Sequence, residues 1–419
     1  MPRQRVRIAA LIAATSLATA ACGHGDDQQV TAGSSTTIAP GPEQPTSTAP
    51  AVTTMSGMPP VIDPSNIYSE AGANHFSPAT VGAKFLVYVP NEASSTLTVI
   101  DPHTYAVTAT WPMRMLPQHV VPAYDMSRLW VLNNEGDAVT PVDPLTGEPG
   151  TPINVEDPYN LYFMPDGHEA IVVEEAWQRL AFVDPNTFQV NGPKAQLGCE
   201  GFNHMDFSID GRFMVGSCEF DGQMLKIDTA TRQVVGRFKL DPVAAGLGDP
   251  GRPLQPQDVR LSNDGKVFYV ADIVADGVFL IDAESFTQIG FLHTDEGAHG
   301  LYPSRDGRQL YVVNRGVSII PAPGSYKGRA RGSVSVVDFA TRQVVGKWEM
   351  PDGGSPDMGA LNPDGGELWL GGRYDAEVYV FDTRAGRLTH RIPAGQNPHG
   401  LTVWPQPGRF SFGHTSNAR

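Results

Sequence analysis

The chain has 419 residues, of which 18% are charged, and its formal net charge is −15. This surplus of acids argues against nucleic acid as a partner, because phosphate backbones repel an acidic surface. The 44 glycines and 36 prolines favour a folded chain with many tight turns over a disordered polyelectrolyte.

Residues 1–21 have the pattern of a secretory signal, so we expect the protein to be exported. Three arginines precede a short apolar run at residues 8–14, which is too short to span a bilayer as a stable helix. Small residues then lead directly to Cys22, and this resembles the lipobox of bacterial lipoproteins, although Thr19 stands where leucine is more usual. We expect lipidation of Cys22, which would hold the protein at the extracytoplasmic face of the cell membrane through the anchor alone. Cleavage without lipidation is the alternative.

Residues 22–60 are expected to form a disordered tether. They are rich in Gly, Ser, Thr and Pro and show no apolar periodicity. The remaining residues, 61–419, are expected to form one domain, with residues 61–83 packed along its rim.

A run of β-forming residues that ends in aspartate recurs seven times after residue 84. The aspartates follow one another at intervals of 41 to 56 residues: Asp101, Asp143, Asp184, Asp228, Asp282, Asp338 and Asp382. Repeats of this length built from strands and turns are typical of a β-propeller. A turn follows each aspartate, so we interpret these carboxylates as structural groups that bind backbone amides.

The order of strands within the repeats predicts how the ring closes. The first repeat lacks an innermost strand before residue 85, whereas the last innermost strand, at residues 399–404, has no strands after it. We therefore predict an all-β fold, a single seven-bladed β-propeller whose C-terminal strand completes the first blade and removes the open sheet edges. A closed ring needs no partner to fold, so we expect a monomer. Residues 409–414 have no place in this repeat.

Three short phrases carry a resemblance to a known family. They are VYVPN at residues 87–91, FYVAD at 268–272 and LYVVN at 310–314, and Asp-Gly turns accompany several repeats. Over nearly all of residues 84–404 the chain resembles the YVTN family of β-propeller repeats, and within it the exported YncE-like proteins. The resemblance implies the fold and export, but it implies no single activity, because propellers carry unrelated functions on one scaffold.

Two cysteines remain besides Cys22. Cys199 and Cys218 flank one predicted pair of neighbouring strands, so we expect a disulfide, which suits an exported protein. Two buried free thiols are the alternative.

Polar residues recur where the innermost strands begin, near the axis of the ring. Four of the 11 histidines fall there. The candidate ligand-binding residues are His119, Asn160, His204, Asp258, His299, Asp357 and His399, together with Glu219, Arg315 and Arg373 from the ends of the neighbouring strands. A concave site with convergent polar groups is the usual form of a ligand site. Two insertions, at residues 241–256 and 317–332, lengthen loops on the same face.

Several histidines at one position could ligate copper, zinc or haem iron. The candidate metal ligands are His119, His204, His299 and His399, with Asp258 and Asp357 to orient them. Opposite sides of a ring could be too far apart for one ion, whose bonds to nitrogen are about 2 Å. The alternative is that these histidines only hydrogen-bond the loops around them.

The sequence lacks the common catalytic signatures, namely G-x-S-x-G, H-E-x-x-H and the P-loop. We therefore expect the propeller to bind a small molecule, a peptide or an envelope protein at its axial mouth, without chemistry of its own. One alternative is an oxidoreductase that depends on metal or haem, or a lactonase-like hydrolase, using the same ring. Another is a protein-interaction platform whose two inserted loops make the contacts.

Overall fold

A computed structural model describes residue 55, residues 58–318 and residues 329–419. They belong to one compact unit, residues 51–419. The predicted signal, Cys22 and most of the predicted tether lie outside the described residues. Within the described residues, no helix is both long enough and apolar enough to cross a membrane.

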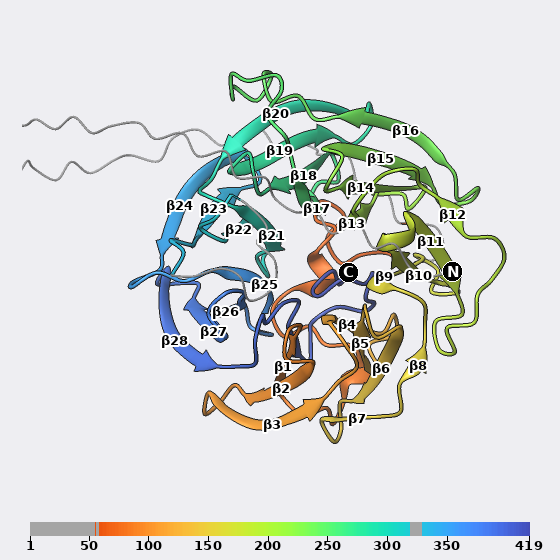
Figure 1. The fold of residues 1–419 in the computed structure, drawn as a ribbon, viewed down its shortest axis with the longest axis vertical. Coiled ribbons are helices and arrows are strands. Elements are labelled where there is room, and N and C mark those ends of the chain that lie inside the picture. The colour runs from red at the N-terminus through yellow and green to blue at the C-terminus, as the bar shows by residue number, and fades with distance from the viewer. Residues whose placement is uncertain (1–54, 56–57, 319–328) are drawn as a thin grey trace, which may run out of the picture. The chain divides into compact units, whose positions relative to one another are not determined.

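Seven antiparallel sheets are arranged as blades around a central axis (Figure 1). We number the blades along the chain. Blade 1 has the strand order β29-β1-β2-β3, and β29 is the last strand of the chain. Val87 of β1 pairs with Val403 of β29, so the predicted closure of the ring by the C-terminal strand is confirmed. The fold is a seven-bladed β-propeller, as the repeats predicted.

Each blade has an inner, a second, a third and an outer strand, of which the inner one lies nearest the axis (Figure 1). The inner strands are β29 (Thr402–Trp404), β4 (Pro117–Pro122), β9 (Pro158–Phe163), β13 (Phe202–Phe207), β17 (Pro256–Leu261), β21 (Ala298–Pro303) and β25 (Pro356–Leu361). The second strands are β1 (Leu86–Asn91), β5 (Leu129–Asn133), β10 (Ala170–Glu174), β14 (Phe213–Cys218), β18 (Val267–Asp272), β22 (Gln309–Asn314) and β26 (Glu367–Gly372).

The third strands are β2 (Thr96–Asp101), β6 (Ala138–Asp143), β11 (Arg179–Val183), β15 (Gln223–Asp228), β19 (Gly277–Asp282), β23 (Ser333–Asp338) and β27 (Glu377–Asp382). The outer strands are β3 (Ala106–Pro112), β7 (Glu148–Pro149) with β8 (Ile153–Asn154), β12 (Ala195–Gln196), β16 (Val234–Lys239), β20 (Thr287–His293), β24 (Gln343–Glu349) and β28 (Arg387–Pro393). The described part of the chain also contains three 3-10 turns: η1 (Ser69–Ala71), η2 (Pro78–Thr80) and η3 (Glu175–Trp177).

Burial falls from the axis outward, and this explains the sequence pattern of each strand. Strands β4, β13, β17 and β25 are buried at every position, whereas the outer strand β16 alternates between half-buried and exposed residues. Apolar clusters fill the spaces between neighbouring blades, for example where Trp130 and Phe163 of blades 2 and 3 belong to one cluster. The outer strands therefore need only one apolar face.

The recurring aspartates hold turns, as predicted. Asp184, which directly follows β11, accepts hydrogen bonds from the backbone amides of Asn186 (3.0 Å) and Thr187 (2.8 Å). These bonds favour the carboxylate and lower its pKa. The same arrangement recurs at Asp338, so these groups serve the fold and not the axial site.

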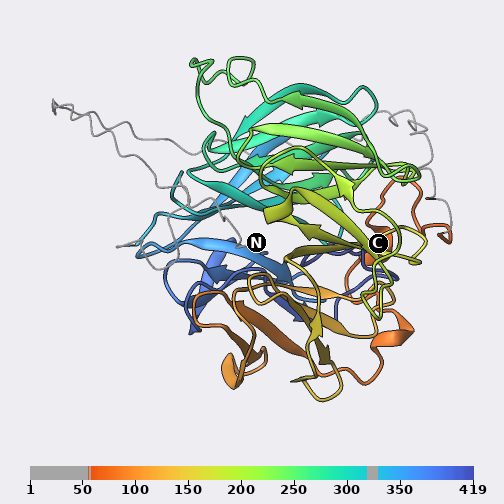
Figure 2. The same cartoon turned by 45° about the vertical axis from the view of Figure 1, so that its right-hand side comes forward.

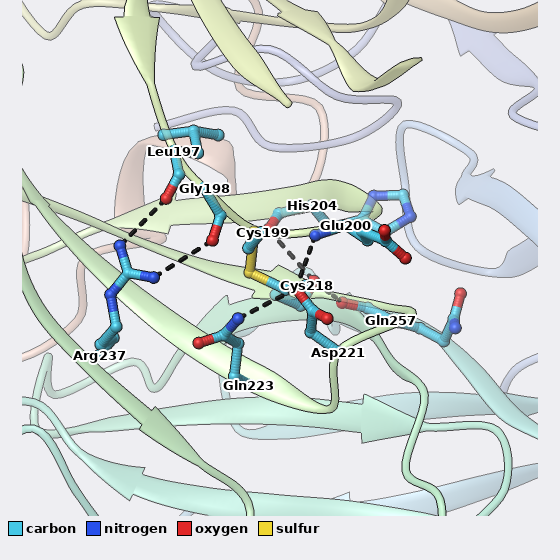
Figure 3. The surroundings of a disulfide bond; sticks show 11 residues. Leu197, Gly198, Cys199, Glu200, His204, Cys218, Asp221, Gln223, Arg237 and Gln257 are labelled. Atoms are coloured by element: carbon cyan, nitrogen blue, oxygen red, sulfur yellow. Dashed lines mark hydrogen bonds between the residues drawn. A yellow bond between two sulfur atoms is a disulfide. The ribbon is translucent and has the colours of Figure 1, made fainter. Parts of the chain in front are cut away.

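The predicted disulfide is present in blade 4 (Figure 3). It joins Cys199, which precedes β13, to Cys218 at the end of β14, with 5.9 Å between the Cα atoms. Two hydrogen bonds from Arg237 to the backbone oxygens of Leu197 and Gly198 hold the same loop. The chain is thus fixed where it enters β13.

The two faces of the ring differ. On the face that we call the mouth face, the inner strands begin, and the loops from outer to inner strands emerge there. The first inserted loop, between β16 and β17, packs partly into the protein, because Ala245 and Leu254 belong to an apolar cluster. Residues 319–328, most of the second insertion, lie outside the described residues.

The opposite face, which we call the turn face, is covered by two segments that lie on the same side of the ring (Figure 2). Residues 58–83 contact the turns that end the inner strands, where Tyr68 donates to the backbone oxygen of Leu261 (2.6 Å). This segment therefore crosses the turn face, and not the rim as its sequence suggested. The second segment is residues 405–419, which contacts the first through the bridge between Phe76 and Gly408.

Candidate functional site

The start of the inner strands is irregular in most blades, and this irregularity builds the axial site. In β13 the pairing with β14 shifts between Phe202 and Met205, so Asn203 and His204 have no partner in the ladder. The same shift occurs at the start of β17, β21 and β25. In β4 the shift leaves out only Gln118, and His119 pairs with Leu132. A shift of this kind redirects side chains out of the strand alternation. Two successive residues of a blade can therefore both supply polar groups to the axis.

The candidate residues lie in two groups. The upper group, which we call the mouth, contains Asp357, His299, His399, Arg315, Arg373 and Glu219. The lower group, which we call the lower layer, contains His119, Asn160, His204 and Asp258. All these side chains are buried, except that Arg373 keeps 12% of its side chain exposed.

Asp357 is the centre of the mouth. Its carboxylate lies 3.1 Å from Nδ1 of His299 and 3.0 Å from Nδ1 of His399. Nε of Arg315 donates to Oδ1 of Asp357 (2.7 Å), and Nη1 of Arg373 lies 3.7 Å from Oδ2. Arg315 also reaches Nε2 of His299 through Nη2 (2.7 Å). One buried carboxylate therefore joins blades 1, 6 and 7.

Two buried carboxyl groups complete the mouth. Glu92, which the sequence reasoning missed, accepts from Arg373 and lies 3.9 Å from Nε2 of His399. Glu219 accepts from the side chain of Asn203. Burial raises the pKa of both glutamates, against the opposite effect of the guanidinium groups nearby. Glu92 directly follows β1, a second strand, and this position could have identified it from the sequence.

The lower layer also contains His414, which lies outside the repeats and was not predicted from the sequence. Segment 405–419 enters the axis, and the backbone amide of His414 donates to the oxygen of Leu161 (2.8 Å). The ring centre of His414 lies 4.9 Å from that of His204 and 5.2 Å from that of His119. Nε2 of His414 lies 3.5 Å from Oδ1 of Asp258.

The axial histidines are close enough to interact across the ring. The ring centres of His119 and His399 are 4.8 Å apart, and those of His204 and His299 are 6.1 Å apart. Burial is the main cause that lowers the pKa of His119, His204, His299, His399 and His414 well below the usual histidine range. These imidazoles are therefore neutral at physiological pH, and a neutral imidazole nitrogen is a metal ligand.

Two surface hollows lie away from the axis. One, of about 580 Å³, lies between blades 1 and 2 and includes Trp111; another, of about 510 Å³, lies between blades 7 and 1 and includes His390. Neither contains an axial residue. We define the candidate site by the polar groups at the axis.

The fold and this site define the protein as a seven-bladed β-propeller with a buried, histidine-rich axis. Among curated relatives, a protein of Escherichia coli O157:H7 named uncharacterized protein YncE is 25% identical over 186 residues, which is 43% of this chain and 47% of that protein. A protein of the same name from Salmonella typhi is 24% identical over 188 residues, covering 44% and 48% of the two chains. These matches and the seven blades support a YncE-like propeller family. The chain spans about half the length of the curated relatives it matches.

Solved structures show the fold alone. A functionally unknown protein from Desulfotomaculum acetoxidans is 12% identical with a TM-score of 0.60, and the match covers 76% of this chain and 99% of that one. Dihydro-heme d1 dehydrogenase NirN in complex with DHE is 12% identical, with a TM-score of 0.55 and 81% and 78% covered. Kuenenia stuttgartiensis hydrazine synthase is 19% identical, with a TM-score of 0.53 and 68% and 88% covered. A scan against models of known protein families matches none of them.

Proposed function

We propose that the protein is exported, is attached to the extracytoplasmic face of the cell membrane through a lipid on Cys22, and binds a small polar ligand at its mouth without chemistry of its own. The observation that carries the proposal is the set of polar atoms at the mouth that find no partner among the described residues. Gln118 and Asn203 belong to the mouth, because they directly follow the first paired residue of β4 and β13, as His299 does in β21. Oε1 of Gln118 and Oδ1 of Asn203 are both buried without a hydrogen bond. An unsatisfied buried polar atom costs about 1–3 kcal/mol, so a bound ligand that donates to it would recover that free energy.

The charges of the mouth indicate the chemistry of the ligand. Asp357 and Glu92 offset the two guanidinium groups of Arg315 and Arg373. Glu219 adds a third carboxyl group, whose pKa is raised by burial. The mouth therefore carries at most one net negative charge, and an ion of high charge would meet no matching opposite charge. A small molecule with hydrogen-bond donors for the free amide oxygens, and with little net charge, fits this arrangement better.

The ligand can be sought by thermal unfolding of the full chain, expressed with its own export signal. The screen would use amino acids, sugars and small carboxylic acids. A ligand at 100 times its Kd stabilises the native state by about 2.7 kcal/mol, which corresponds to a rise of about 5 °C in Tm for a large domain. We expect Gln118→Ala and Asn203→Ala to lose this rise.

A matched control is Gln406→Ala, which removes a buried amide on the turn face. It should lower the Tm of the free protein but keep the rise with ligand. The proposal is contradicted if no compound of the screen raises the Tm, or if the two mouth variants respond as the wild type does.

Attachment to the membrane has its own test. Cys22→Ala should move the protein from the membrane fraction to the soluble extracytoplasmic fraction, because a lipid needs the thiol of that residue. Equal membrane association of the wild type and the variant would contradict a lipid anchor on Cys22.

A further inference from the structure

Beneath the mouth, three blades and segment 405–419 bring four potential metal ligands together. His119 comes from β4, His204 from β13, Asp258 from β17 and His414 from the segment. The ligand atoms of His204, Asp258 and His414 all lie within 4.8 Å of one another, and none of these residues is exposed. We propose that His204, Asp258 and His414, with His119 beside them, bind one divalent transition-metal ion such as Zn²⁺ or Cu²⁺. This inference does not rest on the proposed ligand at the mouth.

The unpaired nitrogen atoms of this layer point to a ligand. Nε2 of His204, Nε2 of His414 and both ring nitrogens of His119 have no hydrogen-bond partner among the described residues. Buried polar groups in folded proteins nearly always have partners. Four unpaired nitrogens within one layer would therefore cost several kcal/mol, at about 1–3 kcal/mol each, unless they bind something.

Hydrogen bonds within the protein satisfy only some of the ring nitrogens of the lower layer. Nδ2 of Asn160 lies 3.3 Å from Nδ1 of His204 and 3.3 Å from Nδ1 of His414. Asn160 thus holds both rings from behind and leaves each Nε2 directed elsewhere. With an ion at Nε2, the ring protons reside on Nδ1, and the Asn160 amide turns its oxygen toward them, as partners behind metal-bound histidines do. This turn gives up the hydrogen bond that Oδ1 of Asn160 accepts from the backbone amide of Leu161 (2.9 Å), so the ion must offset that loss.

The charges and atom types select the kind of ion. Imidazole nitrogens suit zinc, copper and nickel, whereas calcium and magnesium prefer sites made of oxygen. Both oxygens of Asp258 already accept backbone amides, from Val259 (2.9 Å) and Leu301 (3.0 Å), so its carboxylate is held in place. Arg260 lies 3.7 Å from Asp258 and offsets its negative charge. A divalent ion would therefore leave the layer positive, and a hydroxide as a further ligand would reduce that charge.

The mouth histidines are less suited to this role. Nδ1 of His299 and Nδ1 of His399 also lack a hydrogen bond, but each lies beside the carboxylate of Asp357 (3.1 and 3.0 Å). The guanidinium group of Arg315 contacts Nε2 of His299 (2.7 Å), and its positive charge disfavours a cation there. The structure thus favours a set that keeps His119 and His204 of the sequence-based proposal and replaces the other two by His414 and Asp258.

An ion bound here would also hold segment 405–419 in the axis, because His414 belongs to that segment. Binding of the ion and docking of the segment would then stabilise each other by the same free energy. The segment should become more protected when the ion is bound.

The test uses the full chain, freed of metal with EDTA and titrated with Zn²⁺, Cu²⁺ or Co²⁺ alone. We expect one ion per chain, and visible absorption typical of a four-coordinate site with Co²⁺. His204→Gln and His414→Gln should each weaken binding by at least about 100-fold, because loss of a ligand exceeds the 10–100-fold effect of losing a partner behind one. His299→Gln in the mouth and His103→Gln on the surface are the controls and should bind as the wild type does.

Circular dichroism in EDTA checks that each variant is folded. If His204→Gln does not fold, His414→Gln decides, since His414 lies outside every strand. The proposal is overturned if the wild type binds no stoichiometric ion, if His414→Gln binds as tightly as the wild type, or if His103→Gln loses the ion equally. Loss of the ion in His299→Gln but not in His414→Gln would move the site to the mouth and would also overturn it. None of these results decides whether a small molecule binds at the mouth, which the thermal unfolding screen tests separately.

Discussion

Asp206 holds segment 405–419 in the axis, so a single substitution there should release the segment. Asp206 is fully buried at the turn-face end of β13. Its Oδ1 accepts from Nδ2 of Asn417 (3.0 Å) and from Nη2 of Arg419 (2.8 Å). Its Oδ2 accepts from the backbone amide of Leu261 (2.9 Å). The carboxylate thus joins two blades to the segment that carries His414.

The size of the effect follows from the bonds that change. Asp206→Asn keeps the shape and an acceptor oxygen, but it removes the negative charge opposite Arg419. A hydrogen bond to a charged group contributes about 1.5–3 kcal/mol. Loss of about 2 kcal/mol corresponds to roughly 30-fold more of the undocked segment at equilibrium, because each 1.4 kcal/mol is a factor of ten.

Hydrogen exchange followed by mass spectrometry measures this equilibrium directly. The amides of Ser411, Phe412 and His414 donate to the backbone oxygens of Tyr124, Asn417 and Leu161. Their exchange should become roughly 30-fold faster in Asp206→Asn, while the amides of the outer blades keep their wild-type rates. Unchanged exchange in residues 405–419, or equal acceleration throughout the protein, would refute the reasoning.

Three further predictions concern the scaffold. Replacing Cys199 and Cys218 by serine should lower the free energy of unfolding by about 3 kcal/mol, since the bridge closes a loop of 19 residues; denaturant melts with and without reductant check this. Burial raises the pKa of Asp272 to about 6, above its ordinary value of 3.8, so the native state keeps the proton longer. The protonated Asp272 side chain stabilises the native state fully below pH 3.8. As the pH rises from 3.8 through 6 this contribution is lost, and the free energy of unfolding falls by about 3 kcal/mol. Melts from pH 4 to 7 should show this fall in the wild type and less of it in Asp272→Asn. Gly359→Ala should destabilise blade 7 by about 1–3 kcal/mol or prevent folding, since a Cβ atom would lie 1.8 Å from a backbone oxygen of β26. Gly346→Ala, where the nearest atom is 3.6 Å away, should leave thermal unfolding nearly unchanged.

The blades could be predicted because each repeat carries its own local signals. Runs of β-forming residues, the turn aspartates and the missing inner strand of blade 1 together specify the ring and its closure. The outer strands of blades 2 and 3 were harder to predict from the sequence. They are reduced to β7, β8 and β12, in sequence rich in proline and glycine, which weaken a strand.

The site could be predicted only in part. The recurrence of polar residues at the start of the inner strands identified seven side chains, and the ends of the neighbouring strands added three. The structure brings all ten together at the axis. Their roles in binding stay predictions. His414 was missed because it belongs to no repeat, and its approach to His204 depends on packing between distant segments. The separation into a mouth and a lower layer depends on where each strand leaves its ladder, which local sequence does not specify.

A crystal structure of the protein purified from the exported fraction without chelator, with data collected above the zinc and copper absorption edges, tests the central claim that the axis is a binding site. We predict electron density other than water beside Gln118 and Asn203 in the mouth, or an anomalous peak among His204, Asp258 and His414. Ordered water molecules that satisfy every one of these polar atoms, with no anomalous signal, would contradict the account.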